Sequence, residues 1–172
     1  MAPRAAWRLE ILGFGNVYWY KGGKADWTAA GLPFDGHLSR VPRIGDNVRR
    51  DVPTCRPDER IADVRDRVRT ASWNTCFVVT ADGTVLGRLH DRELDGAGDA
   101  AADVMRSGPS TFRPDVTVHQ MLDYMREHEL TTVPVTTSEG KLIGLALLED
   151  LEAAHGSEVS ARTSSRPRGS EP

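Results

Sequence analysis

Cysteine is scarce in this chain: Cys55 and Cys76 are the only two among 172 residues, and neither stands in a Cys-x-x-Cys or Cys/His arrangement. We therefore expect no disulfide framework and no zinc site. The Arg-Pro-Asp that follows Cys55 raises the alternative of a nucleophilic cysteine beside an anion-binding loop. The same frame recurs later with Phe112 in place of the cysteine, which favours a packing role for Cys55.

Long apolar runs and an excess of positive charge are also missing. Arg8 and Glu10 interrupt the only early apolar stretch, so we expect no signal peptide, no membrane span and a cytoplasmic location. The formal net charge of −3 provides no basic face for a phosphate backbone, so nucleic acid is not an expected partner.

Patterns typical of catalytic sites are absent as well. The chain has no Ser/His/Asp order and no GxxxxGK loop, and neither His119 nor His128 has a partner at metal-ligand spacing. The sequence therefore predicts a protein that is not an enzyme and requires no cofactor or metal.

What the chain does contain is an internal duplication without gaps. Residues 84–94 and 141–151 are similar, and Gly87 and Gly144 mark a constant offset (144 − 87 = 57). The same offset relates the pairs Thr54 and Thr111, Arg49 and Arg106, Pro57 and Pro114, and Leu94 and Leu151. Such a duplication indicates two copies of one supersecondary unit, each too small to bury its apolar face alone and therefore packed against the other.

Both copies show the same order of predicted elements. A short helix (46–50 or 103–106) precedes an extended segment at Thr54 or Thr111. Arg-Pro-Asp then opens a second helix, whose apolar stripe is Ile61, Val64, Val68 and Ala71 in the first copy and Val118, Met121, Leu122 and Met125 in the second. A β-hairpin follows, with its turn at Asp82-Gly83 or Glu139-Gly140, and a final helix begins near Asp91 or Leu148.

The remaining segments do not share the repeat. The first 36 residues predict a helix (5–12), a strand (17–20) and a second helix (24–30), and their large apolar side chains need a partner surface. Residues 37–45 read as a linker. Residues 156–172 are almost wholly Gly, Ser, Arg, Pro and Glu, which predicts a disordered tail.

The second copy carries a family resemblance. Its residues Thr111-Phe112-Arg113-Pro114-Asp115, Val133-Pro134-Val135, Glu139 to Gly144 and Asp150-Leu151 resemble the cystathionine-β-synthase (CBS) domain. The resemblance implies an α/β fold in which residues 46–155 form a tandem CBS-domain pair of two pseudo-symmetric β-α-β-β-α units, with repeat 1 at 46–97 and repeat 2 at 103–154. It also implies an adenosine-type ligand, such as AMP, ADP, ATP or S-adenosylmethionine, and a homodimer.

A nucleotide cleft needs an apolar slot for the base, a carboxylate for the ribose hydroxyls and donors for phosphate. In the second copy Val133 and Pro134 can wall the base and Thr111 offers a hydroxyl, while Asp150 stands where the family places its ribose carboxylate. Leu147 occupies the position at which the family has Ser or Thr.

The first copy departs from the pattern in a different way. His90 stands at the Ser/Thr position, Glu93 at the Asp position and Thr54 at the position of Thr111. His90 and Arg92 could hold phosphate through positive charge. An alternative interpretation of Glu93 and Asp150 is a solvated acidic helix start.

The N-terminal segment carries a second resemblance. Gly13-Phe14, Val17 to Tyr20, Gly22-Gly23, Trp27 and Ala29 to Pro33 resemble the C-terminal end of a rhodanese-like domain, which implies a helix-strand-helix remnant at residues 1–36. The persulfide-carrying cysteine of that family would precede Met1, so we expect no sulfurtransferase activity from this chain.

These observations lead to one main hypothesis, a non-catalytic ligand-sensing module with an adenosine-type compound in the second cleft. Two alternatives remain: a protein-interaction module whose clefts bind nothing, and the regulatory part of a longer rhodanese-like sulfurtransferase fusion.

Overall fold

The computed structural model describes residues 2–29, 32–33, 35–36, 41–96 and 98–164 and shows a mixed α/β fold. Helices α1 (Ala2–Ile11) and α2 (Gly23–Ala29) come first. The first repeat contains η2 (Ile44–Asp46), β1 (Val48–Arg49), β2 (Thr54–Cys55), α3 (Ile61–Thr70), β3 (Thr75–Val79), β4 (Val85–His90) and α4 (Asp91–Leu94). The second contains α5 (Ala101–Val104), β5 (Arg106–Ser107), α6 (Val118–Glu127), β6 (Thr132–Thr136), β7 (Leu142–Leu147) and α7 (Leu148–Ser164).

Each repeat contributes one short strand to the sheet of the other. The strand orders are β2-β3-β4-β5 and β1-β7-β6. Strand β5, from the second repeat, pairs with β4 of the first, with Arg106 opposite Arg88. Strand β1, from the first repeat, pairs with β7 of the second, with Arg49 opposite Leu145. The two pairings are related by the offset of the duplication (106 − 49 = 57 and 145 − 88 = 57), so the exchange is pseudo-symmetric.

The tips of the two hairpins also join the repeats. The Val85 amide donates to the Gly140 carbonyl and the Leu142 amide donates to the Gly83 carbonyl, each at 3.0 Å. Both glycines have positive φ values, +87° at Gly83 and +84° at Gly140, which residues with a Cβ rarely adopt. These two hydrogen bonds are again equivalent under the offset and define a pseudo-twofold axis between the repeats.

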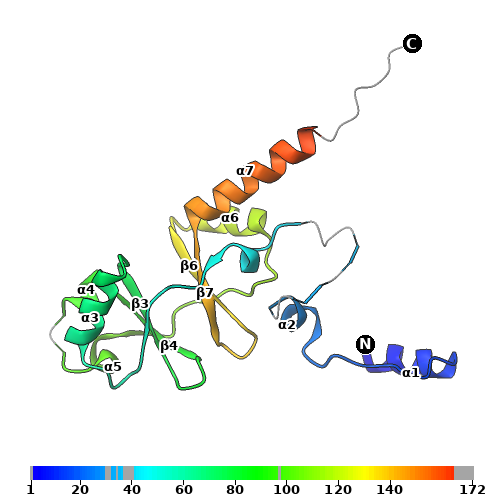
Figure 1. The fold of residues 1–172 in the computed structure, drawn as a ribbon, viewed down its shortest axis with the longest axis horizontal. Coiled ribbons are helices and arrows are strands. Elements are labelled where there is room, and N and C mark those ends of the chain that lie inside the picture. Colours follow the sequence, from blue (N-terminus) through cyan, green and yellow to red (C-terminus); the bar gives the residue numbers. More distant parts are fainter. Residues whose placement is uncertain (1, 30–31, 34, 37–40, 97, 165–172) are drawn as a thin grey trace, which may run out of the picture.

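Three apolar clusters hold this arrangement together. Helix α3 buries Ile61, Val64 and Val68 with Cys55 and Cys76 in the first repeat. Helix α6 buries Val118, Met121, Leu122 and Met125 in the second. A third cluster joins Val52, Phe77 and Leu145 and therefore spans both repeats. The predicted packing of one copy against the other is confirmed, and Figure 1 shows α3 and α4 beside β3 on one side of the pair and α6 beside β6 on the other.

Several predicted elements differ from the structure because contacts with residues distant in the sequence determine their conformation. The predicted helices at 46–50 and 103–106 are wrong: the chain turns earlier, in η2 and α5, and then forms β1 and β5. Sheet hydrogen bonds to the other repeat replace the local helix there. Ala71, assigned to the apolar stripe of α3, is the exposed cap that ends this helix.

The segments outside the repeats also differ from the prediction. Residues 17–20 are not a strand, because no described strand lies beside them to pair with. Helix α7 continues to Ser164, although the sequence predicts disorder from Gly156. A formed helix adds one hydrogen bond for each residue it orders, and a glycine inside it costs only about 1 kcal/mol. Residues 37–40 of the predicted linker and 165–172 of the predicted tail lie outside the described residues.

The exchanged strand β1 can be tested with a single methyl group. A Cβ on Gly144 would lie 2.5 Å from the Arg49 carbonyl oxygen and 3.1 Å from the Val48 Cβ. Because this contact involves backbone, Gly144→Ala should lower the free energy of unfolding by about 1–3 kcal/mol, measured by urea denaturation. Gly156→Ala is the matched control, since nothing lies within 4 Å of its Cβ position. Equal stability of the two variants would contradict the close packing of β1 on β7.

Candidate functional site

Two acidic residues lie at equivalent places, each in the first turn of the helix that follows a central strand: Glu93 in α4 after β4, and Asp150 in α7 after β7. Each is held by an arginine of the exchanged strand. Arg49 donates from Nε to Asp150 Oδ2 at 2.7 Å and from Nη2 to Oδ1 at 2.9 Å. Arg106 donates from Nε to Glu93 Oε1 at 2.7 Å. Both predicted ribose carboxylates are thus engaged by the other repeat.

The two carboxylates differ in how accessible they are. The Asp150 side chain is 31% exposed, whereas the Glu93 side chain is 10% exposed and also accepts the His90 amide at 3.0 Å. An ionised carboxylate can accept about four hydrogen bonds. Arg49 uses one on each oxygen of Asp150, so this carboxylate keeps acceptor capacity that faces solvent.

Both acids are ionised at neutral pH. The hydrogen bond and the charge of Arg49 lower the pKa of Asp150. Burial raises the pKa of Glu93, but the hydrogen bonds from Arg106 and from the His90 amide outweigh it, and the net pKa is lowered. A carboxylate that remains ionised is the form that accepts hydrogen bonds from sugar hydroxyls.

The other predicted residues of the second cleft are only partly brought together. Thr111 is exposed and accepts a hydrogen bond from the Thr136 hydroxyl at 3.1 Å, and the Pro134 carbonyl accepts the Phe112 amide at 2.9 Å. Thr111 therefore lies beside β6, on the edge of the sheet away from β1 and Arg49. No contact in the described structure joins it to Asp150.

Val133, which the sequence assigns to the wall of the cleft, has its side chain in the core of the second repeat. Val133 is 1% exposed and packs in the core of the second repeat with the α6 residues. Side chains alternate along a strand, so Val133 and Pro134 of β6 point to opposite faces of the sheet. Pro134 is buried and pairs with Leu145, on the side that meets the first repeat.

In the first cleft the predicted residues are also dispersed. Thr54 is exposed in β2, on the far side of β3 from His90, and its carbonyl accepts a hydrogen bond from Arg67 at 3.1 Å. Arg92 is exposed on α4. Burial, followed by the charges of Arg88 and Arg106, lowers the pKa of His90, so this imidazole is mostly neutral at pH 7. A phosphate contact from His90 would be a neutral N–H hydrogen bond and not the charge that the sequence predicts.

Sequence reasoning missed three arginines. Arg49 and Arg106 could have been found, because they are related by the same offset as Glu93 and Asp150, and the repeat thus pairs a base with an acid in each copy. Arg88 could also have been found, because a charged residue stands in the hairpin strand where the second copy has Leu145. Its Nε donates to Thr75 at 2.9 Å and its Nη2 donates to Thr132 at 2.8 Å.

The sequence matches the CBS domain family over residues 44–97 and 101–155, which is more than half of the chain. The chain belongs to this family. Two CBS domains in tandem, with the opening segment of each paired into the sheet of the other, account for the duplication.

Related proteins share this part of the chain. An inosine-5'-monophosphate dehydrogenase of Halobacterium salinarum is 27% identical over 70% of this chain, which spans only 26% of that enzyme. YlbB of Bacillus subtilis is 29% identical over 64% of this chain and 80% of its own length. The chain thus covers about a quarter of the dehydrogenase, so the activity of that enzyme does not carry over to it.

Solved structures show the same fold. CBSX2 of Arabidopsis thaliana, in complex with AMP, has a TM-score of 0.61 at 18% identity and covers 69% of this chain and 98% of its own. The CBS domain pair of MJ0100, in complex with 5'-methylthioadenosine and S-adenosylmethionine, has a TM-score of 0.58 at 16% identity over 69% and 98%. The cytosolic domain of the Mg²⁺ channel MgtE, in complex with ATP, has a TM-score of 0.59 at 22% identity over 68% and 51%.

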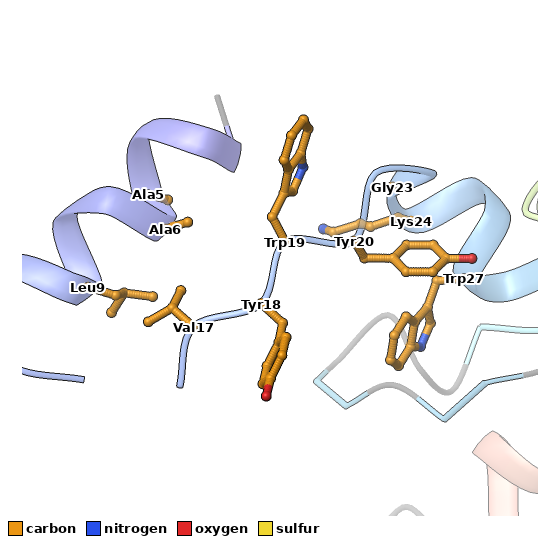
Figure 2. A pocket seen from close by; sticks show the side chains of 10 residues that line it. All are labelled: Ala5, Ala6, Leu9, Val17, Tyr18, Trp19, Tyr20, Gly23, Lys24 and Trp27. Carbon is orange, nitrogen blue, oxygen red and sulfur yellow. The ribbon is translucent and has the colours of Figure 1, made fainter. Parts of the chain in front are cut away.

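A further hollow, away from the repeats, lies on the N-terminal segment. It has a volume of about 330 Å³ and is lined by Leu9 of α1, by residues 17–20 and by Trp27 of α2. Figure 2 shows the extended chain at Tyr18 and Trp19 running between the two helices. The family match begins at residue 44 and gives no support to the predicted rhodanese-like remnant.

The described part of the chain contains no candidate membrane span and no candidate metal cluster. No helix there is long and apolar enough to cross a bilayer. No group of three or more His, Cys, Asp or Glu side chains is placed to hold a metal ion among those same residues.

The ion pair between Arg49 and Asp150 predicts a pH-dependent contribution to stability. Because the pKa of Asp150 is lower in the folded than in the unfolded state, this contribution is complete above the unfolded value of about 3.9 and is lost as the pH falls through the folded value. Arg49→Gln should therefore lower the melting temperature at pH 7, and the difference from the unmodified protein should shrink below about pH 3.

Arg92→Gln is the matched control, since the structure shows no ion pair for this exposed arginine within the described residues. Melting curves measured at several pH values follow both variants. A gap for Arg49→Gln that remains as large at about pH 2 as at pH 7 would contradict the assignment.

Proposed function

We propose that this chain is a regulatory module that binds an adenosine-type ligand in the second cleft, with Asp150 accepting hydrogen bonds from the ribose. The observation that carries the proposal is the ionised, 31% exposed carboxylate of Asp150 at the start of α7, which retains free acceptor positions. The complexes of CBSX2 with AMP and of MgtE with ATP support it, because both proteins share the fold. The module itself carries out no reaction in this proposal, and the ligand acts as a signal.

The same carboxylate offers a route for that signal. Ribose hydroxyls that approach Asp150 compete with Arg49 for its oxygens. Arg49 belongs to β1, a strand of two residues whose register with β7 is Val48 to Ala146 and Arg49 to Leu145. A ligand that weakens the arginine fork therefore loosens a strand with few other hydrogen bonds, and the change reaches the segment that precedes it. The expected cellular location is the cytoplasm and the expected assembly a homodimer, as the sequence predicts.

A second candidate function is supported by the N-terminal segment. Within the described residues, all the large apolar side chains that are well exposed lie in this segment. Along the chain, the first is Trp7, which is 63% exposed, and the last is Leu32, which is 37% exposed. A surface of this kind marks a protein-interaction site. The resemblance of this segment to the end of a rhodanese-like domain favours the alternative in which the CBS pair is the regulatory part of a longer rhodanese-like sulfurtransferase fusion.

Calorimetric titration with AMP, ADP, ATP and S-adenosylmethionine tests the main proposal. One or more of these ligands should bind, and Asp150→Asn should weaken binding by about 1–3 kcal/mol, because the substitution removes a charged hydrogen-bond acceptor. Arg49→Gln should not weaken binding, since it removes the competitor for the same oxygens.

Glu149→Gln is the matched control, because its carboxylate is 73% exposed and also contacts Arg49, at 3.3 Å. It should bind as the unmodified protein does. If none of the four compounds produces heat or raises the melting temperature, the protein-interaction function is favoured instead.

A further inference from the structure

Residues 17–20 have the composition and the path of a β-strand but no strand beside them. Val17, Tyr18, Trp19 and Tyr20 are β-branched or aromatic, the residue types that favour strands. Figure 2 shows Tyr18 and Trp19 pointing to opposite sides of the extended chain, as side chains alternate along a strand. No described residue forms a main-chain hydrogen bond with the amide or the carbonyl of Val17, Tyr18 or Trp19. These main-chain groups are therefore available to a partner strand.

The described part of this chain offers no such strand. Every strand of its two sheets lies between Val48 and Leu147, and none of them is a neighbour of residues 17–20. The elements on either side of the segment are the helices α1 and α2 (Figure 2), and a helix uses its interior main-chain groups for its own hydrogen bonds. A strand added here comes from another polypeptide, in the way that an extended peptide joins an exposed sheet edge.

The side chains around the segment are apolar, exposed and partly fixed in place. Tyr18, Trp19 and Tyr20 are 90%, 51% and 46% exposed. The ring of Tyr20 meets Trp27 edge to face at 5.3 Å, and the Trp27 indole N–H donates to the Pro33 carbonyl at 2.9 Å. These contacts hold the α2 side of the 330 Å³ hollow in place before any partner arrives.

The apolar surface is large enough for a specific contact between two copies of the chain. Trp7, Phe14, Tyr18, Trp19 and Tyr20 are between 46% and 90% exposed. An aromatic side chain has about 150–250 Å² to bury. Covering these five in each of two copies would remove roughly 1,200 Å² from water, which is the lower end of the range for specific interfaces.

The sequence of the segment is complementary to itself in an antiparallel pair. When Tyr18 lies opposite the partner's Tyr18, Val17 of each copy lies opposite Trp19 of the other. Pairs of a β-branched and an aromatic residue stabilise neighbouring strands. In the same register Lys21 lies opposite Gly15, so no two like charges are brought directly together.

We propose that residues 17–20 pair antiparallel with the same residues of a second copy of this chain, and that the hollow beside them is part of the apolar surface that the second copy covers. The family match begins at residue 44, so this contact lies outside the CBS domains. The proposal rests on the second candidate function, the protein-interaction surface, and names its partner. It is independent of an adenosine-type ligand at Asp150.

Hydrogen exchange of the full chain, followed by mass spectrometry at increasing protein concentration, tests the pairing. The amides of residues 17–20 should exchange about tenfold more slowly, or slower still, in the concentrated than in the diluted protein. Alternate amides of a strand face one neighbour, so at least one of Tyr18→Pro and Trp19→Pro removes a donor of the pair and should abolish this protection. Leu12→Ala is the matched control, because it removes a side chain that is 63% exposed but no main-chain donor, and it should keep the protection.

A fluorescently labelled peptide of residues 14–22 is the second probe. Its anisotropy should show saturable binding to the full chain, and the same peptide with methylated amide nitrogens at Tyr18 and Trp19 should bind about tenfold more weakly or worse. Equal binding of the two peptides, or exchange at residues 17–20 that does not depend on concentration, would overturn the proposal. Association through the repeats alone leaves that exchange unchanged and therefore also counts against it. Protection of residues 17–20 in a protein that binds none of the four adenosine compounds would leave the pairing in place and sink the ligand function.

Discussion

The structure depends on the exchange of one short strand between the two repeats. Strands β1 and β5 contain two residues each, and neither would form without the longer strand of the other repeat beside it. The exchange brings Arg49 to the acid of the second repeat and Arg106 to the acid of the first. The strand that completes each sheet therefore also carries the cation that neutralises the carboxylate beside it. Fold and candidate site therefore share the same few contacts.

The two repeats keep one backbone frame but have diverged in the side chains that face a ligand. At equivalent positions of the central strands the first repeat has Arg88 paired with Phe77, and the second has Leu145 paired with Pro134. Glu93 is nearly covered, whereas Asp150 is open enough to accept further hydrogen bonds. The more accessible carboxylate thus belongs to the second repeat, and the additional arginine, Arg88, belongs to the first. Such a division favours one ligand that uses both repeats over two equivalent ligands, because neither cleft contains the full set of groups.

The described part of the N-terminal segment contributes no residue to the three apolar clusters that form the core of the repeats. Tyr18 and Trp19 remain exposed, at 90% and 51%, whereas the large apolar residues of the repeats are buried in the three clusters or packed against them. Figure 1 shows helix α1 lying apart from the sheets. Asp26 of α2 accepts a hydrogen bond from the Ser138 hydroxyl at the β6–β7 hairpin. The segment is therefore joined to the repeats near the hairpin that lies on the pseudo-twofold axis.

The sequence alone determined the features that repeat at short range. The offset of 57 predicted two packed copies, the apolar stripes predicted α3 and α6, and the glycine turns predicted both hairpins, because helix period, strand alternation and turn chemistry are local properties. Only the tertiary structure decided the exchanged strands, the unpaired residues 17–20 and the burial of Val133. The Arg49–Asp150 pair joins residues 101 apart, and Arg88 meets Thr132 across 44 residues. No local pattern encodes such contacts, since they exist only when the fold has brought two distant surfaces together and excluded water between them.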